Sequence, residues 1–184
     1  MNRKVWISGV AIVLGSVLML SLAWGLQHAA LANPPLLGKT APRLAIQTST
    51  GDRVKVWELQ GKPVVLNFWA SWCGPCQQET PLLASWYKQE HGRIALVGLD
   101  ENDTTSKALA FAHAKGVTYT LGFDPQLTVT GPYDVDGLPQ TFFLNAQHRI
   151  VEHVLGAMTK ADLAQGVTLM NTPGTPSEKT VEPS

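Results

Sequence analysis

Cysteine is scarce in this chain: two occur in 184 residues, which excludes a small domain held together by several disulfide bonds. Because Cys73 and Cys76 are close in sequence, a bond between them would close almost no loop and add little stability. An excess of charge is also missing, since 14 Lys and Arg residues balance 14 Asp and Glu residues. A near-neutral chain offers no basic footprint for nucleic acid. The two cysteines are therefore expected to serve chemistry, without a nucleic-acid partner.

A long stretch without charge lies near the N-terminus, at residues 5–26. As a helix its 22 residues would reach about 33 Å, enough to cross a hydrocarbon core of about 30 Å. Arg3 and Lys4 precede it and stay in the cytoplasm by the positive-inside rule. The alternative is a signal peptide cleaved after Ala32. Because the apolar run is longer than is usual for a signal peptide, a retained signal-anchor is favoured, and both interpretations export the body of the protein.

The chain is expected to divide into four regions. These are a membrane anchor or signal segment at 1–32, a linker at 33–42, a folded domain at 43–170 and a disordered tail at 171–184. Within the domain we predict a hairpin at 43–56 and strands at 64–70, 94–99, 119–123, 141–144 and 150–155. Helices should begin at the cysteines, at Asp103 or Thr104, and after a capping box at 159–162. This order predicts an α/β fold with a mixed sheet flanked by helices.

A Cys-x-x-Cys motif follows the buried strand at 64–70, in the segment Trp72-Cys73-Gly74-Pro75-Cys76, and opens a helix. Unpaired N–H groups and the dipole at a helix N-terminus stabilise a thiolate, which would lower the pKa of Cys73 and make it the attacking sulfur. Cys76 lies one turn deeper and could attack the mixed disulfide to release product. Pro75 suits the first turn, where no N–H bond is lost. The motif indicates dithiol redox chemistry.

A zinc half-site and two incidental thiols are the alternatives to a redox dithiol. Zinc would need two further ligands, and the sequence holds no other cysteine. The histidines that could serve are scattered without paired spacing: His91, His113, His148 and His153. We therefore expect no metal site and no cofactor.

Two more distant residues support the dithiol. Glu79 follows Cys76 at i+3, where it could exchange a proton with that thiol; the alternative is an ordinary solvated residue of the helix surface. Pro139 stands just before a strand, where a cis bond would make a tight turn, although a lone X-Pro bond is more often trans. Pro81 lies inside the helical pattern and is expected to kink the helix.

The segment 64–81, VVLNFWASWCGPCQQETP, resembles the active-site stretch of the thioredoxin superfamily, and more narrowly its membrane-anchored TlpA/ResA/DsbE branch. Three further segments fall where that branch has flanking motifs, at 38–42, 61–63 and 137–142. The resemblance runs from about residue 38 to residue 164. It implies a thioredoxin-like domain at 43–170 with an N-terminal β-hairpin extension and one N-terminal transmembrane helix.

The resemblance also implies roles for single residues. Cys73 would be the nucleophile, Cys76 the resolving thiol and Pro139 the cis-proline. Glu79 matches the acid of the branch's Cys-x-x-Cys-x-x-Glu-x-Pro pattern. The residues expected to contact substrate lie beside these groups: Trp72, Gly74, Pro75 and Leu138.

One residue departs from the thioredoxin pattern, and the dipeptide between the cysteines does not identify a branch of the superfamily. Asn67 stands where cytosolic thioredoxins carry a buried Asp that accepts a proton from the deeper thiol. Because Asn cannot titrate, Glu79 or water would have to take over that task. The Gly-Pro dipeptide between the cysteines is that of thioredoxin itself, and since these residues help to set the redox potential, the direction of electron flow stays open.

The function implied is that of an exported, membrane-tethered thiol–disulfide oxidoreductase that acts as a reductant. Members of the branch reduce disulfides in clients such as apocytochrome c before haem attachment, during cytochrome c maturation. A transmembrane thiol carrier reduces them again after each reaction, which is necessary because the compartment is oxidising. We expect a single-pass protein of the cytoplasmic (inner) membrane with its catalytic domain on the periplasmic side.

Two other classes remain as alternatives. A peroxiredoxin-like peroxidase shares the Gly-Lys-x-Ala-Pro opening, but expects its cysteine in a Pro-x-x-x-Thr-x-x-Cys setting that this sequence lacks. A non-enzymatic module could instead deliver copper or hold a client protein. Copper delivery would favour soft ligands beside the dithiol, and the sequence places none recognisably.

Overall fold

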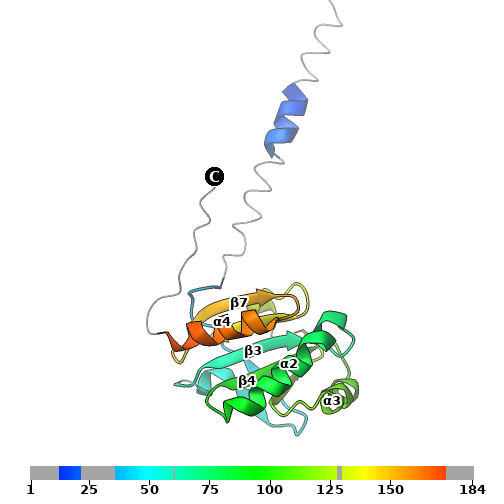
Figure 1. Cartoon of the computed structure of the whole chain (residues 1–184). Helices are drawn as coiled ribbons and strands as arrows, with labels where there is room; N and C mark the ends of the chain where they lie inside the picture. Colours follow the sequence, from blue (N-terminus) through cyan, green and yellow to red (C-terminus); the bar gives the residue numbers. More distant parts are fainter. Residues whose placement is uncertain (1–12, 22–35, 60, 128–129, 173–184) are drawn as a thin grey trace, which may run out of the picture. The chain divides into compact units, whose positions relative to one another are not determined.

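The computed structural model describes residues 13–21, 36–59, 61–127 and 130–172 (Figure 1). The chain divides into two units, Met1–Pro35 and Leu36–Ser184. In the first unit, residues 13–21 are helical. Among the described residues, no helix is both long and apolar enough to cross a membrane. The rest of the predicted anchor, the start of the linker and the predicted tail beyond residue 172 lie outside the described residues.

The second unit is built on one mixed sheet of seven strands in the order β2-β1-β5-β4-β3-β6-β7. The central strands β3, β4 and β5 are parallel, and the remaining pairs are antiparallel. The strands are β1 Ala45–Gln47, β2 Arg53–Lys55, β3 Val64–Trp69, β4 Ala95–Glu101, β5 Thr120–Asp124, β6 Gln140–Leu144 and β7 Ile150–Leu155. The predicted mixed α/β architecture is confirmed.

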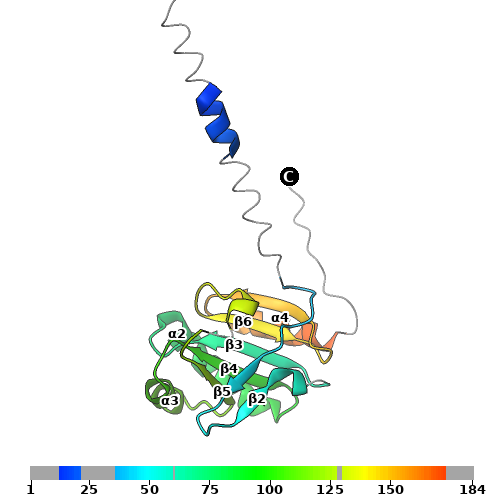
Figure 2. The same cartoon turned by 180° about the vertical axis from the view of Figure 1, so that it is seen from behind.

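Three α-helices cover one face of this sheet, as Figures 1 and 2 show. They are α2 Gly74–Glu90, α3 Thr105–Ala114 and α4 Lys160–Asn171. The crossovers β3–α2–β4 and β4–α3–β5 step across the sheet in the same direction, so right-handed connections place both helices on the same side. The opposite face is covered by the chain leading into β1 and by two short 3-10 helices, η1 Val56–Leu59 and η2 Gly131–Tyr133.

The hairpin predicted at 43–56 forms, with β1 and β2 joined by a turn at Gly51, whose φ of 88° favours glycine. It extends the main sheet, because β1 also pairs with β5 through Gln47 and Phe123. The capping box before α4 is confirmed as well, since the side chain of Thr159 accepts from the Asp162 N–H and the Asp162 carboxylate accepts from the Thr159 N–H.

The start of α3 differs in part from the expectation. The N-cap residue of α3 is Thr104, but its side chain makes no capping bond; the Asp103 carboxylate accepts from the Thr104 N–H instead. Helix α2 continues through Pro81 to Glu90, ending before Gly92 as predicted.

Strand β4 also runs two residues further than the predicted strand, through Asp100 to Glu101. Its end lies beside the end of β3, because Trp69 and Asp100 are partners in the parallel register. The segments that follow the two strands, the cysteine segment and the loop at 102–104, therefore leave the sheet at the same edge. This edge is where ligand sites form in α/β folds.

Candidate active site

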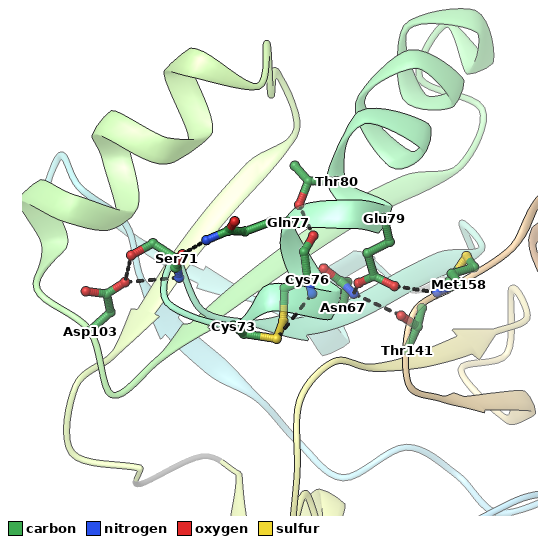
Figure 3. The surroundings of a disulfide bond; sticks show 10 residues. All are labelled: Asn67, Ser71, Cys73, Cys76, Gln77, Glu79, Thr80, Asp103, Thr141 and Met158. Carbon is green, nitrogen blue, oxygen red and sulfur yellow. Dashed lines mark hydrogen bonds between the residues drawn. A yellow bond between two sulfur atoms is a disulfide. The ribbon is translucent and has the colours of Figure 1, made fainter.

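The predicted Cys-x-x-Cys pair forms a disulfide at the start of α2 (Figure 3). Cys73 is the N-cap residue of the helix, and its sulfur accepts a hydrogen bond from the Cys76 N–H at 3.2 Å. This bond uses one of the unpaired N–H groups of the first turn, as predicted from the sequence. In a reduced protein the same group would stabilise a thiolate on Cys73.

The two sulfur-bearing residues differ in their access to a client. Cys73 lines an open groove of about 500 Å³ on the surface. Both cysteines belong to the buried cluster with Trp69, Ala108 and Ala112, but Cys73 keeps 5% of its surface exposed whereas Cys76 has none. The geometry therefore allows an incoming disulfide to reach Cys73 and leaves Cys76 to act from the inside.

Glu79 is buried, with 2% of its surface exposed, which excludes the alternative of a solvated surface residue. Its Oε1 accepts from the Asn67 side chain at 2.8 Å, and its Oε2 accepts from the Met158 N–H at 2.7 Å. The Asn67 amide also donates to the Thr141 hydroxyl at 2.9 Å across the β3–β6 pair. Figure 3 shows this network on one side of the disulfide.

Burial raises the pKa of Glu79, and the bonds from Met158 and Asn67 act in the opposite direction because they stabilise the charged form. Both oxygens face donors, so the site holds a carboxylate well while its burial favours the neutral acid. A carboxyl group with a raised pKa, one turn beyond Cys76, is placed to exchange a proton with that thiol. Asn67 does not titrate, but it orients the group that does.

The loop that carries the cysteines is fixed on the other side of the disulfide. The Asp103 carboxylate accepts from both the N–H and the hydroxyl of Ser71. The Gln77 side chain donates to the Ser71 carbonyl at 2.8 Å, and the Trp72 indole N–H donates to the Asn102 carbonyl at 3.2 Å. The loop after β4 thus holds the loop after β3 in place.

The groove beside Cys73 brings together all the residues predicted to contact substrate: Trp72, Gly74, Pro75 and Leu138. Trp72 is 59% exposed, which is unusual for so large an apolar side chain and suits a contact surface. The Leu138–Pro139 peptide bond is cis, as the resemblance implies. Residues distant in sequence thus meet at one face of the disulfide.

Two acidic residues that sequence reasoning missed lie at this edge. Asp100 and Glu101 end β4 and are 1% and 5% exposed, and Glu101 lines the groove. The available signal was the position of two acids directly after an apolar strand run, at the carboxyl end of a parallel strand. No group of three or more His, Cys, Asp or Glu residues in the described ranges is arranged to hold a metal ion.

Comparisons with known proteins agree with this geometry. Residues 37–153 match the model of the AhpC/TSA family. The chain is 31% identical over 148 residues to thiol-disulfide oxidoreductase ResA of Bacillus subtilis (strain 168), covering 79% of this chain and 83% of that protein.

Solved structures show the same similarity. A crystal structure from Chlorobium tepidum, provisionally assigned as the thiol:disulfide interchange protein DsbE, superposes with a TM-score of 0.66 at 28% identity, covering 72% of this chain and 95% of that one. A secreted disulfide oxidoreductase of Mycobacterium tuberculosis, described as homologous to E. coli DsbE, gives a TM-score of 0.63 at 25% identity, covering 68% and 94%.

Proposed function

This chain belongs to the AhpC/TSA family as a ResA/DsbE-like thiol–disulfide oxidoreductase, and on that premise we propose that it reduces disulfides in exported client proteins. The observation that carries the proposal is the asymmetry of the cysteine pair: Cys73 lines an open groove at a helix N-terminus, whereas Cys76 is fully buried behind it. An attacking thiolate needs access to its client, and a resolving thiol does not.

The reaction proceeds in two exchanges. The Cys73 thiolate attacks one sulfur of the client disulfide, forms a mixed disulfide, and releases the other client sulfur as a thiolate that takes up a proton. The Cys76 thiolate then attacks the Cys73 sulfur and releases the second client thiol. The client gains two electrons and the protein ends as the Cys73–Cys76 disulfide, which a transmembrane thiol carrier must reduce again.

Several residues beside the cysteines complete the proposed site. Glu79 accepts the proton of Cys76 before the second exchange, and Asn67 orients its carboxylate. Pro139, whose bond to Leu138 is cis, takes the role of the cis-proline, and the residues named above as groove contacts, Trp72 and Leu138 among them, hold the client segment. An apocytochrome c on its way to haem attachment is a client that fits a reductant of this kind.

The equilibrium potential of the Cys73–Cys76 pair against glutathione and dithiothreitol tests the direction of electron flow. We expect a value nearer to that of thioredoxin, about −270 mV, than to that of DsbA, about −120 mV. A value above about −180 mV would instead make the protein an oxidase or an isomerase.

The tether is part of the same proposal, and the uncharged run at 5–26 behind Arg3 and Lys4 supports it. The four regions at 1–32, 33–42, 43–170 and 171–184 then serve as anchor, linker, catalytic domain and tail. The full chain should stay with the membranes during carbonate extraction. A soluble mature form beginning at Asn33 would overturn the anchor and leave a secreted reductase.

A further inference from the structure

The groove beside Cys73 contains two acidic residues that the exchange reaction does not use. Glu101 lines it from the end of β4, and Asp136 lines it from the loop before β6. No lysine, arginine or histidine is among the described residues that line this groove. The wall that faces a client disulfide is therefore acidic.

Glu101 is buried without the partner that such a group needs. Its residue surface is 5% exposed, and within the described part of the chain its Oε1 has no hydrogen-bond partner. The same holds for Oδ1 of its neighbour Asp100, which is 1% exposed. Leaving a buried polar group unpaired destabilises the folded protein, and more so when the group is charged. Because Glu101 lines the groove, its unpaired carboxyl oxygen points to a partner that arrives with the client.

The acidic surroundings of Glu101 indicate that the client group that pairs with it is positively charged. Burial, together with the nearby carboxylates of Asp124 and Asp100, raises the pKa of Glu101 to about 8. Burial and the nearby Asp103 raise the pKa of Asp100 to about 7. A cation bound beside Glu101 would favour the charged form of its carboxyl group.

We propose that Glu101 is a docking point for an arginine side chain of the client, located beside the disulfide to be reduced. The guanidinium group keeps its charge at every relevant pH and presents a planar fork of donors, which suits a carboxylate with an unpaired oxygen atom. When Glu101 is protonated in the free protein, the incoming guanidinium displaces its proton. This inference rests on the proposed function only in placing client disulfides in the groove.

The test uses two disulfide peptides that differ at one residue beside the cystine, arginine in one and its neutral isostere citrulline in the other. The rate of exchange with the full-length protein gives kcat/KM for each. We expect the arginine peptide to be preferred about tenfold, the order of magnitude of one charged hydrogen bond. Glu101→Gln should bring the ratio close to one, whereas Glu58→Gln, an exposed acid on η1, should leave it unchanged.

The pH dependence of the same ratio provides a second measurement on the unaltered protein. Below about pH 8 the guanidinium must displace a proton, so the preference should be several-fold smaller at pH 6.5 than at pH 8.5. Taking the ratio cancels the titration of the thiols, which the two peptides share.

An equal rate for the two peptides, or a preference that survives Glu101→Gln, would overturn the docking site. Exchange can be followed in either direction. A potential that contradicts the reductase would therefore leave the preference measurable, and the two proposals fail separately.

Discussion

Cys73 and Cys76 have the same side chain and lie in the first turn of the same helix, α2, but their surroundings differ. Cys73 accepts an N–H of the first turn and lines the groove, whereas Cys76 is fully buried. We expect Cys73 of the reduced protein to alkylate first and to titrate below the reference value of about 8.5. Cys76→Ser should hold clients as mixed disulfides that mass spectrometry detects, and Cys73→Ser should hold none. Faster alkylation of Cys76 would reverse the two roles.

The paired donors around Glu79 allow a second prediction at this scale. Glu79→Gln removes the proton acceptor while preserving the shape of the side chain, so exchange should slow about tenfold or more and lose its pH dependence between roughly pH 5 and 8. Because Asn67 and Met158 both donate to this side chain, the amide of the variant must turn one N–H toward a donor. Stability should therefore fall by about 1–2 kcal/mol as well.

The control for this variant is Glu90→Gln near the other end of α2, where the acid pairs with Arg93 at the surface. Rates measured by stopped flow across the pH range separate the two effects of the Glu79 substitution. A merely structural role would shift all rates together, and an unchanged pH profile would remove Glu79 from the mechanism.

At the scale of elements, helix α4 approaches the sheet at a glycine. A Cβ added to Gly166 would come far inside van der Waals contact of the buried Phe143 ring on β6. Alanine would ordinarily stabilise the middle of a helix by about 1 kcal/mol relative to glycine. Overpacking a core costs about 1–3 kcal/mol, and contacts this short belong at the upper end, so Gly166→Ala should lower the free energy of unfolding by up to about 2 kcal/mol.

Urea denaturation provides the measurement for this prediction. Gly131→Ala is the matched control, since an added Cβ there meets no atom within 4 Å. An equally stable Gly166→Ala variant would mean that α4 is free to move away from β6.

The elements that could be predicted from the sequence are those whose signals are local. The apolar run gave β3, which is buried at all six positions, and the capping box gave the start of α4. The predicted end of β4, at residue 99, was wrong, because two acidic residues after an apolar run, Asp100 and Glu101, are typical of the beginning of a loop. Only the neighbouring strands β3 and β5 explain why these acids continue a strand.

The candidate site shows the same division. The positions of Cys73 and Cys76 follow from a motif of five residues, and the cis bond at Pro139 followed from the resemblance. The partners of Glu79 could not be predicted, since Asn67, Thr141 and Met158 come from three separate segments. Likewise, β1 joins the sheet through a single pair with β5, more than seventy residues away.

At the scale of the whole molecule, the numbers of acidic and basic residues are equal, but one region of the fold is rich in acidic residues. Fourteen acidic residues match fourteen basic ones, but buried carboxyl groups gather at the end of β4. The ordinary pKa values of Asp100 and Glu101, 3.8 and 4.5, rise to about 7 and about 8 in the folded protein. The folded state therefore binds protons that the unfolded state has already lost.

Because the folded state binds more protons than the unfolded state, the oxidised protein becomes less stable as the pH rises. Groups with raised pKa values contribute stability that is present below about pH 4 and lost as the pH passes through about 7 and 8. Glu79 acts in the same direction, and His153, whose lowered pKa has the opposite effect, matters only below about pH 6.5.

Between pH 6.5 and 8.5 the free energy of unfolding should consequently fall by about 2–3 kcal/mol, as measured by urea denaturation with the disulfide intact. The double variant Asp100→Asn/Glu101→Gln removes both titrating groups and should show little change over this window. The exposed Glu58→Gln should keep the full slope. A wild-type protein equally stable at both pH values would show that neither carboxyl group titrates within this window in the folded protein.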